Sequence, residues 1–252
     1  MILLIIIRGD IIVGCEFTTS FAGRLIEVLG YGFDYQKVDQ YLSSCYSAEK
    51  INETTRVLYQ RLLAKISDLG LTLAAHSDQA TTFDCEFFER KIYDELTKYP
   101  ENKKILPEDI WDSFSDFFRK GLTNPASKLF INHAEFKPAL SEIIRIVHEA
   151  GGIVMLAHPF QYKFTDTESF LDNIYEENDF DGVECFYTTF SRKQTEYLVN
   201  FAKKRNLLIS GGSDYHGTNK KQHELGIGRG NLAIRKDILT DWKINYYKEE
   251  IR

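Results

Sequence analysis

Three short apolar runs decide the fold of this sequence: GGIVMLAHP at 151–159, GVECFY at 182–187 and LLISGGSDYHG at 207–217. Apolar residues at helical spacing alternate with these runs and predict helices at 138–150, 168–177 and 192–205. Short, continuously apolar strands that alternate with helices are typical of βα units on a parallel sheet that is buried on both faces. We therefore predict an α/β protein in which these runs are neighbouring strands.

The part of the chain before residue 129 has a different character. Residues 11–16, IIVGCE, predict a strand that ends near Glu16, and residues 25–29 predict a second strand after a glycine-containing turn. From about residue 35 the spacing of apolar residues becomes helical and stays so to residue 128. We expect 38–128 to be a helical insertion into a domain that is formed by 1–37 and 129–252.

Composition and charge exclude several classes of protein. The 252 residues include 31 Lys and Arg and 37 Asp and Glu, which gives a formal net charge of −6. Proteins that bind duplex nucleic acid normally carry a net basic surface, so duplex nucleic acid is not an expected partner. A hydrophobic content of 43% predicts a packed globular protein.

The first seven residues, MILLIII, and the cysteines bear on location. The apolar run is far shorter than the roughly 18 residues that a transmembrane helix needs, so no membrane partner is expected. A run this apolar predicts a buried strand with other strands on both sides. Cys15, Cys45, Cys85 and Cys185 have neither CxxC spacing nor the density of a secreted disulfide scaffold, which indicates a reduced, cytoplasmic protein.

Polar residues close several of the predicted strands. Glu16, His158, Asp214 and His216 each end or directly follow an apolar run. Because ligands of parallel α/β sheets bind at the carboxyl ends of the strands, we expect these side chains to converge. Carboxylates and imidazoles together suit Zn, Mn or Fe, and such ions promote hydrolysis near neutral pH. The sequence therefore predicts a divalent-metal site.

The order GGIVMLAHP, GVECFY, GGSDYHG resembles the second half of the PHP (polymerase and histidinol phosphatase) family of metal-dependent phosphoesterases. VGCEFTT at 13–19 and RLIEVLGYGFD at 24–34 resemble the middle of that family, in which a bridging Glu ends one strand and a strand of the type HxLGY follows. The resemblance covers about 11–37 and 130–235, and the helical 38–128 matches an insertion that one branch of the family carries.

The resemblance implies a distorted (β/α)7 barrel that hydrolyses a phosphate ester with a metal-activated water. It implies that Glu16 bridges two metals and that His158 binds one of them. It further implies that Asp214 and His216 bind different metals of a trinuclear cluster and carry the catalysis. The implied substrate is a small phosphate monoester, such as a nucleotide or a compound like histidinol phosphate.

The sequence also departs from the family pattern. The family's opening strands carry a His-x-His motif and an Asp-His motif, and both are absent here, so we expect a barrel that is N-terminally incomplete. Glu27 stands where the family has a His, and its carboxylate is a plausible substitute ligand for a harder ion such as Mn. Only one metal then keeps three ligands, namely Glu16, Glu27 and His158. We predict fewer than three bound ions, of Mn, Zn or Fe.

Basic residues near the strand ends are candidates for binding a substrate phosphate. Lys220 and Arg229 follow the DxH loop, and Arg192 follows the GVECFY strand. Ammonium and guanidinium groups pair with phosphate oxygens. The alternative interpretation is a solvated, charged loop.

Other polar residues fit more than one interpretation. Glu184 either orients a metal ligand or is an ordinary strand-end carboxylate. His76 and His148 fit surface or packing positions, whereas His133 and His223 flank the core motifs and could approach a substrate.

Other functions are less well supported by the residues. Ser213, Asp214 and His216 lie too close in sequence to form a nucleophilic triad. The glycine-rich run at 226–230 lacks the strand-then-helix setting of a phosphate-binding loop. The remaining alternative is a truncated, catalytically impaired PHP domain that acts as a fragment or as a binding module.

Overall fold

The computed structural model describes residues 2–7, 10–74, 88–244 and 247–248. The chain divides into two compact units. Unit 1 comprises Met1–Thr19, Ile26–Leu42 and Pro138–Arg252, and unit 2 comprises Ser20–Leu25 and Ser43–Lys137.

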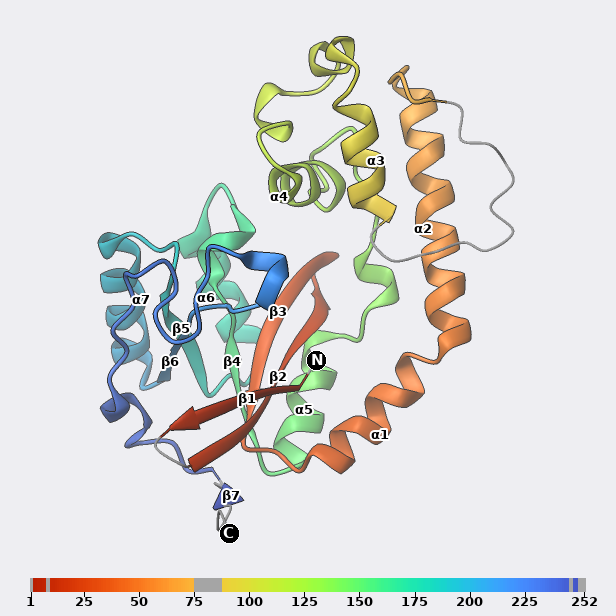
Figure 1. Cartoon of the computed structure of the whole chain (residues 1–252). Coiled ribbons are helices and arrows are strands. Elements are labelled where there is room, and N and C mark those ends of the chain that lie inside the picture. The colour runs from red at the N-terminus through yellow and green to blue at the C-terminus, as the bar shows by residue number, and fades with distance from the viewer. Residues whose placement is uncertain (1, 8–9, 75–87, 245–246, 249–252) are drawn as a thin grey trace. The chain divides into compact units, whose positions relative to one another are not determined.

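Unit 1 is built around one mixed sheet (Figure 1). Its strands are β1 (Ile2–Ile7), β2 (Asp10–Phe21), β3 (Arg24–Tyr31), β4 (Ile153–Leu156), β5 (Gly182–Tyr187), β6 (Leu208–Gly212) and β7 (Tyr247–Lys248). Their order across the sheet is β1-β2-β3-β4-β5-β6, and β7 pairs with β2. β1 with β2 and β3 with β4 are antiparallel, whereas β4, β5 and β6 are parallel, as predicted for βα units.

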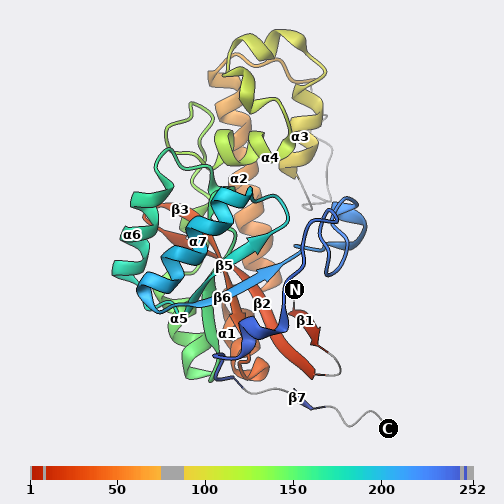
Figure 2. The same ribbon diagram turned by 90° about the vertical axis from the view of Figure 1, so that its left-hand side faces the viewer.

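Helices alternate with the parallel strands. They are α5 (Leu140–Glu149) before β4, α6 (Thr167–Glu177) before β5, and α7 (Arg192–Arg205) before β6. Figure 2 shows α7 in front of the strands β5 and β6, with α6 to its left. All four residues of β4 are buried, which explains its continuous apolar sequence.

Side-chain caps fix where two of these helices begin. The side chain of Asp166 accepts a hydrogen bond from the N–H of Ser169 at the start of α6. Ser191 and Gln194 form a reciprocal capping box at the start of α7, with each side chain accepting from the other residue's backbone N–H. α7 therefore begins soon after β5 ends at Tyr187, whereas a longer segment that contains the turn Pro159–Tyr162 separates β4 from α6.

The predicted strand end at Glu16 is wrong, because β2 continues for five residues beyond it to Phe21. Buried and less buried side chains alternate here, with Cys15 and Phe17 buried and Glu16 half-buried between them. β2 and β3 are joined by a two-residue turn, Ala22 and Gly23, whose φ values of 48° and 72° are typical of a tight hairpin. Glu16 is therefore a charged residue on the less buried face of β2 and does not mark the end of the strand.

The prediction that MILLIII lies inside a sheet is also wrong in part. β1 is a strand, but it lies at one edge of the sheet and pairs with β2 alone among the described strands. The register Ile2 to Cys15 and Ile7 to Asp10 makes it the partner of the following strand in an antiparallel pair. Within the described residues no pairing closes β6 onto β1, so the sheet is an open path and the expected barrel is not shown.

Unit 2 is mainly helical, as the spacing of its apolar residues predicts. Its helices are α2 (Ala48–Asp68), α3 (Phe88–Leu96) and the short α4 (Phe114–Asp116), and α1 (Tyr35–Cys45) spans the boundary between the units. Leu62 on α2 and Ile92 and Leu96 on α3 are almost completely buried in one apolar cluster. Of the helices in the described part of the chain, none is long and apolar enough to cross a membrane.

Candidate metal centre

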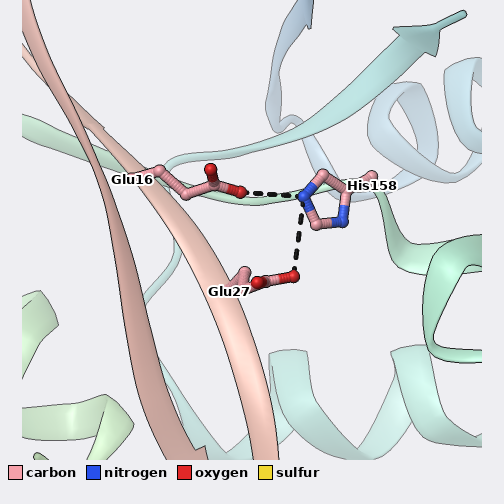
Figure 3. Close-up of side chains that lie close together, drawn as sticks. All are labelled: Glu16, Glu27 and His158. Atoms are coloured by element: carbon pink, nitrogen blue, oxygen red, sulfur yellow. Dashed lines mark hydrogen bonds and ion pairs between the residues drawn. The ribbon is translucent and has the colours of Figure 1, made fainter. Parts of the chain in front are cut away.

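Two carboxylates and one imidazole meet within unit 1 (Figure 3). Glu16 lies in β2, Glu27 lies in β3, and His158 follows the end of β4. Nε2 of His158 is 2.8 Å from Oε1 of Glu16 and 3.7 Å from Oε2 of Glu27. One possible ligand atom from each residue lies within 4.8 Å of the other two, so all three could bind one ion. We call these three residues the first ligand group.

Backbone hydrogen bonds hold the first ligand group together. The N–H of Ala157 donates to the carbonyl of Glu27 at 3.0 Å, which ties β3 to the residue before His158. The N–H of Glu27 donates to the hydroxyl oxygen of Tyr162 at 2.8 Å. The N–H of His158 donates to Oε2 of Glu184 at 2.8 Å. Four elements of unit 1 therefore fix the positions of these side chains.

The backbone of His158 is in an unfavourable conformation. Its φ of 26° and ψ of 59° lie in the left-handed region, although the next residue is Pro159, which normally favours an extended neighbour. Such a conformation persists only where surrounding contacts enforce it, and it is typical of functional sites. The hydrogen bond to Glu184 is one such contact.

The electrostatic potential at His158 is strongly negative. Burial alone lowers the pKa of His158, but the hydrogen bond to Glu16 and the charges of Glu27 and Glu184 outweigh burial and raise the pKa to about 9. The side chain is only 7% exposed. A potential that keeps a proton on a buried imidazole to this pH also favours a bound cation.

Glu184 is a buried carboxyl group behind the first ligand group. Burial raises its pKa to about 7, although the charge and the backbone N–H of His158 oppose this shift. A Cβ atom at Gly212 would lie 3.5 Å from Oε1 of Glu184, so the carboxyl group reaches from β5 to the neighbouring strand β6. Glu184 therefore binds the backbone N–H of His158, which agrees with the interpretation that it orients a metal ligand.

A second ligand group comprises Glu16, Asp214 and His216, whose possible ligand atoms also lie within 4.8 Å of one another. Asp214 follows β6 and has a φ of 51°, a left-handed conformation that Asp adopts more readily than most residues. β5 and β6 change register between Glu184 and Phe186, and this irregularity places Tyr187 opposite Gly212. The side chain of Tyr187 thereby reaches the Asp214 loop.

Asp214 is held by several hydrogen bonds. Its side chain is 8% exposed, and its Oδ2 accepts from the hydroxyl of Tyr187 at 2.6 Å and from Nζ of Lys220 at 2.5 Å. Its Oδ1 lies 3.1 Å from Nδ1 of His216. Burial raises the pKa of Asp214, but the hydrogen bonds from Lys220 and Tyr187 outweigh burial and lower it. Asp214 is therefore ionised at neutral pH.

The residues present fit a divalent cation. Two carboxylate oxygens and one imidazole nitrogen form the mixed donor set that Mn, Zn and Fe accept. The sequence predicts three ligands for one ion only, and the structure brings together a second set of three possible ligands. The reason is spatial, because the fold places Glu16 within reach of both Asp214 and His216 as well as His158. Within the described residues the two groups share Glu16.

The three basic residues predicted to bind substrate have different surroundings. Lys220 contacts Asp214. Arg192 pairs with Glu196 on α7 at 2.7 Å, and its side chain is 91% exposed. The backbone N–H of Arg229 donates to Oγ1 of Thr188 at 2.8 Å, which ties its loop to the residue after β5.

The remaining histidines lie apart from these groups or support them. His133 belongs to unit 2, where its Nδ1 lies 2.9 Å from the carbonyl of Ile131. Nε2 of His148 lies 2.8 Å from Oδ2 of Asp181, as predicted for a packing position. His223 is 7% exposed and its Nδ1 lies 3.4 Å from the carbonyl of Asp214. His76 and Cys85 lie outside the described residues.

Sequence reasoning missed two tyrosines that support the ligand groups. Tyr162 joins the backbones of Glu27 and Ala157 through its hydroxyl, and Tyr187 donates to Asp214. Tyr187 ends a strand, so its place at the carboxyl edge of the sheet was a usable signal. Tyr162 lies in a short turn after Pro159, and no pattern marks it.

Comparisons with known proteins give one related sequence and similar solved structures. No protein-family model matches this sequence. A 5′-3′ exoribonuclease of Haemophilus influenzae is 24% identical over 210 residues, which cover 82% of this chain and 70% of that protein. A crystal structure of a candidate metal-dependent phosphoesterase from Bifidobacterium adolescentis has a TM-score of 0.55 and 22% identity, covering 91% of this chain and 74% of that one.

An amidohydrolase from Chromobacterium violaceum, solved with bound sulfate and no metal, gives a similar result. Its TM-score is 0.57 at 17% identity, and the alignment covers 82% of this chain and 68% of that one. At these identities the two structures establish a shared fold. This chain therefore has a mixed α/β fold similar to that of a candidate metal-dependent phosphoesterase and of an amidohydrolase.

Proposed function

We propose that this protein is a metal-dependent hydrolase that cleaves a small phosphate monoester, such as a nucleotide or a compound like histidinol phosphate. The observation that carries this proposal is the first ligand group, in which possible ligand atoms of Glu16, Glu27 and His158 lie within 4.8 Å of one another. The fold shared with a candidate metal-dependent phosphoesterase supports it.

Each candidate residue has a role in this proposal. Glu16, Glu27 and His158 hold a divalent ion, most suitably Mn, which lowers the pKa of water and polarises a phosphoryl oxygen when bound. Asp214 and His216 are the catalytic residues, and together with Glu16 they offer ligand atoms for a second ion. Nδ1 of His216 faces Asp214, so Nε2 is the ring nitrogen left to bind an ion or a proton.

Three basic residues are proposed to bind the phosphate of the substrate. Lys220 lies at Asp214 and offers N–H donors to a phosphate, and Arg229 and Arg192 are further candidates for this contact.

We also propose that the protein belongs to the PHP family and that unit 1 corresponds to its distorted (β/α)7 barrel, with 38–128 as a helical insertion. The parallel strands β4, β5 and β6 with their alternating helices support this assignment. Cys15, Cys45 and Cys185 are free thiols, which supports a reduced, cytoplasmic location.

A second candidate function is removal of nucleotides from the 5′ end of RNA. It is favoured by the likeness to the Haemophilus influenzae exoribonuclease, which extends over 82% of this chain. Both functions require the same metal-assisted attack on phosphorus. They differ in the leaving group, which is a small alcohol in a phosphate monoester and the remaining RNA strand in an exoribonuclease.

Activity assays with and without Mn²⁺ test the proposal. We expect the purified chain with Mn²⁺ to hydrolyse nucleoside monophosphates, to lose this activity in EDTA, and to regain it when Mn²⁺ is restored. Asp214→Asn should lower kcat at least about tenfold, because a carboxylate at the centre of the site is replaced by a neutral amide.

A 5′-labelled RNA oligonucleotide assayed in parallel separates the two candidate functions. Stepwise loss of 5′ nucleotides without monophosphate hydrolysis would favour the exoribonuclease. If neither substrate is cleaved while Mn²⁺ is bound, the catalytically impaired binding module is the better description. Equal activity of Asp214→Asn and the unaltered chain would contradict the catalytic role of Asp214.

A further inference from the structure

Lys220 lies where a second cation would be expected. Its Nζ is 2.5 Å from Oδ2 of Asp214, and the same oxygen accepts from the hydroxyl of Tyr187. Oδ1 of Asp214 faces His216. Both oxygens of this carboxylate are therefore engaged by side chains of unit 1, and one of those partners carries a full positive charge.

The two ligand groups differ in one partner of their carboxylates: the imidazole of His158 in the first group and the ammonium of Lys220 in the second. In the first group the partner of Glu16 and Glu27 is His158, and an imidazole nitrogen is itself a good metal ligand. In the second group Asp214 contacts the imidazole of His216 through Oδ1, but its Oδ2 also contacts the ammonium of Lys220, which has three donors and no lone pair. An arriving ion can share the site with the imidazole but must displace the ammonium or tolerate its charge.

Repulsion between like charges makes the second group the weaker site. An ion bound by Asp214 would lie a few ångströms from the Lys220 ammonium, because both would contact the same carboxylate. Charges at such a distance repel strongly in a partly buried setting. Lys220 follows Asp214 by six residues and ends a short helical turn at Gly217–Lys220. Because the chain keeps its ammonium close to Asp214, the ammonium has a high effective concentration at this carboxylate and competes well with a free ion.

We propose that the Lys220 ammonium takes the place of a second metal ion at Asp214, so that this chain binds one divalent ion, at Glu16, Glu27 and His158. Because it concerns the same site, this role rests on the proposed function. An ammonium has three N–H donors, so Lys220 holds Asp214 with one and has others for a phosphoryl oxygen. Lys220 thereby supplies the positive charge that a second ion would bring to the substrate.

Metal stoichiometry tests the proposal without any activity assay. Mn²⁺ is titrated into the full chain, and free Mn²⁺ is followed by electron paramagnetic resonance, for the unaltered protein, Lys220→Met and the matched control Lys221→Met. We expect one equivalent on the unaltered protein and on Lys221→Met, and two equivalents on Lys220→Met. The second dissociation constant should fall at least about tenfold relative to any second ion on the unaltered protein.

Two further variants keep the result interpretable. Lys220→Arg retains the charge and should bind one equivalent, and adding Asp214→Asn to Lys220→Met should return the stoichiometry from two to one. Circular dichroism of each variant establishes that it is folded. Two equivalents on the unaltered protein, or one on folded Lys220→Met, would overturn the role of Lys220 while leaving a metal-dependent hydrolase intact. No bound Mn²⁺ on any variant would overturn the metal-dependent function as well.

Discussion

Glu16→Gln is expected to abolish tight Mn²⁺ binding and to lower kcat/KM for a phosphate monoester at least about 100-fold, since even residues that only support metal ligands cost up to about that much. Glu16 is the one residue that belongs to both ligand groups. The amide has nearly the same shape as the carboxylate but lacks its charge, so the variant removes a ligand with little change in packing. Isothermal titration with Mn²⁺ and steady-state kinetics measure the two effects.

A matched substitution shows whether the effect of Glu16→Gln arises at the ligand group or from the loss of any one negative charge. Glu177→Gln removes one negative charge at the exposed end of α6 and is expected to leave Mn²⁺ affinity unchanged. Thermal unfolding of both variants without metal shows whether either is misfolded. If folded Glu16→Gln binds Mn²⁺ as tightly as the unaltered protein, Glu16 is not a ligand and the first ligand group has no role in metal binding.

The stability of the metal-free protein is expected to fall as the pH rises from about 6.5 to 9. The pKa of His158 is raised from 6.5 to about 9 in the folded protein, so the folded state holds this proton more tightly than the unfolded state. The resulting stabilisation is fully present below pH 6.5 and is lost as the pH rises through 9. A shift of this size corresponds to about 3 kcal/mol in the free energy of unfolding.

Glu184 changes stability in the same direction at lower pH. Its pKa is raised to about 7, so its protonated form is favoured in the folded state and its contribution is lost between the unfolded value of 4.5 and about 7. Urea unfolding of the metal-free protein at several pH values measures both contributions. The decline above pH 7 should be much smaller in His158→Gln, and an equal decline in that variant would show that His158 does not carry it.

Mn²⁺ should reverse this trend in the unaltered protein. Ion binding requires the unprotonated imidazole, so affinity rises with pH over the range in which the metal-free protein loses stability. The free energy of unfolding in excess Mn²⁺ should therefore exceed that of the metal-free protein most at pH 9.

The sequence predicted best where a pattern is local. The apolar runs before His158 and Asp214 are continuous and bounded by glycine or proline, and both form parallel strands in the predicted places, although β4 is buried throughout and β6 is only partly buried. His158, Asp214 and His216 could be chosen because the carboxyl ends of parallel strands share one edge of a sheet. Glu16 and Glu27, which the family resemblance places in a metal site with His158, lie close to His158 in the structure.

The errors concern features that depend on contacts between distant segments. Glu16 was placed at a strand end because period-two alternation over β2 is weak where Thr18 and Thr19 replace clearly apolar residues. The antiparallel pairing of β3 with β4 was not foreseen, because nothing local distinguishes a hairpin strand from one in a βα unit. The contact of Lys220 with Asp214 depends on how one loop folds back on itself.

The most direct test of a metal centre at Glu16, Glu27 and His158 is anomalous diffraction from a crystal of the unaltered chain grown with Mn²⁺. We expect one strong anomalous peak, with two carboxylate oxygens and Nε2 of His158 at about 2.0–2.3 Å from it, the range for such ligands. No peak at these three residues, or a peak bound only by residues elsewhere in the chain, would contradict it.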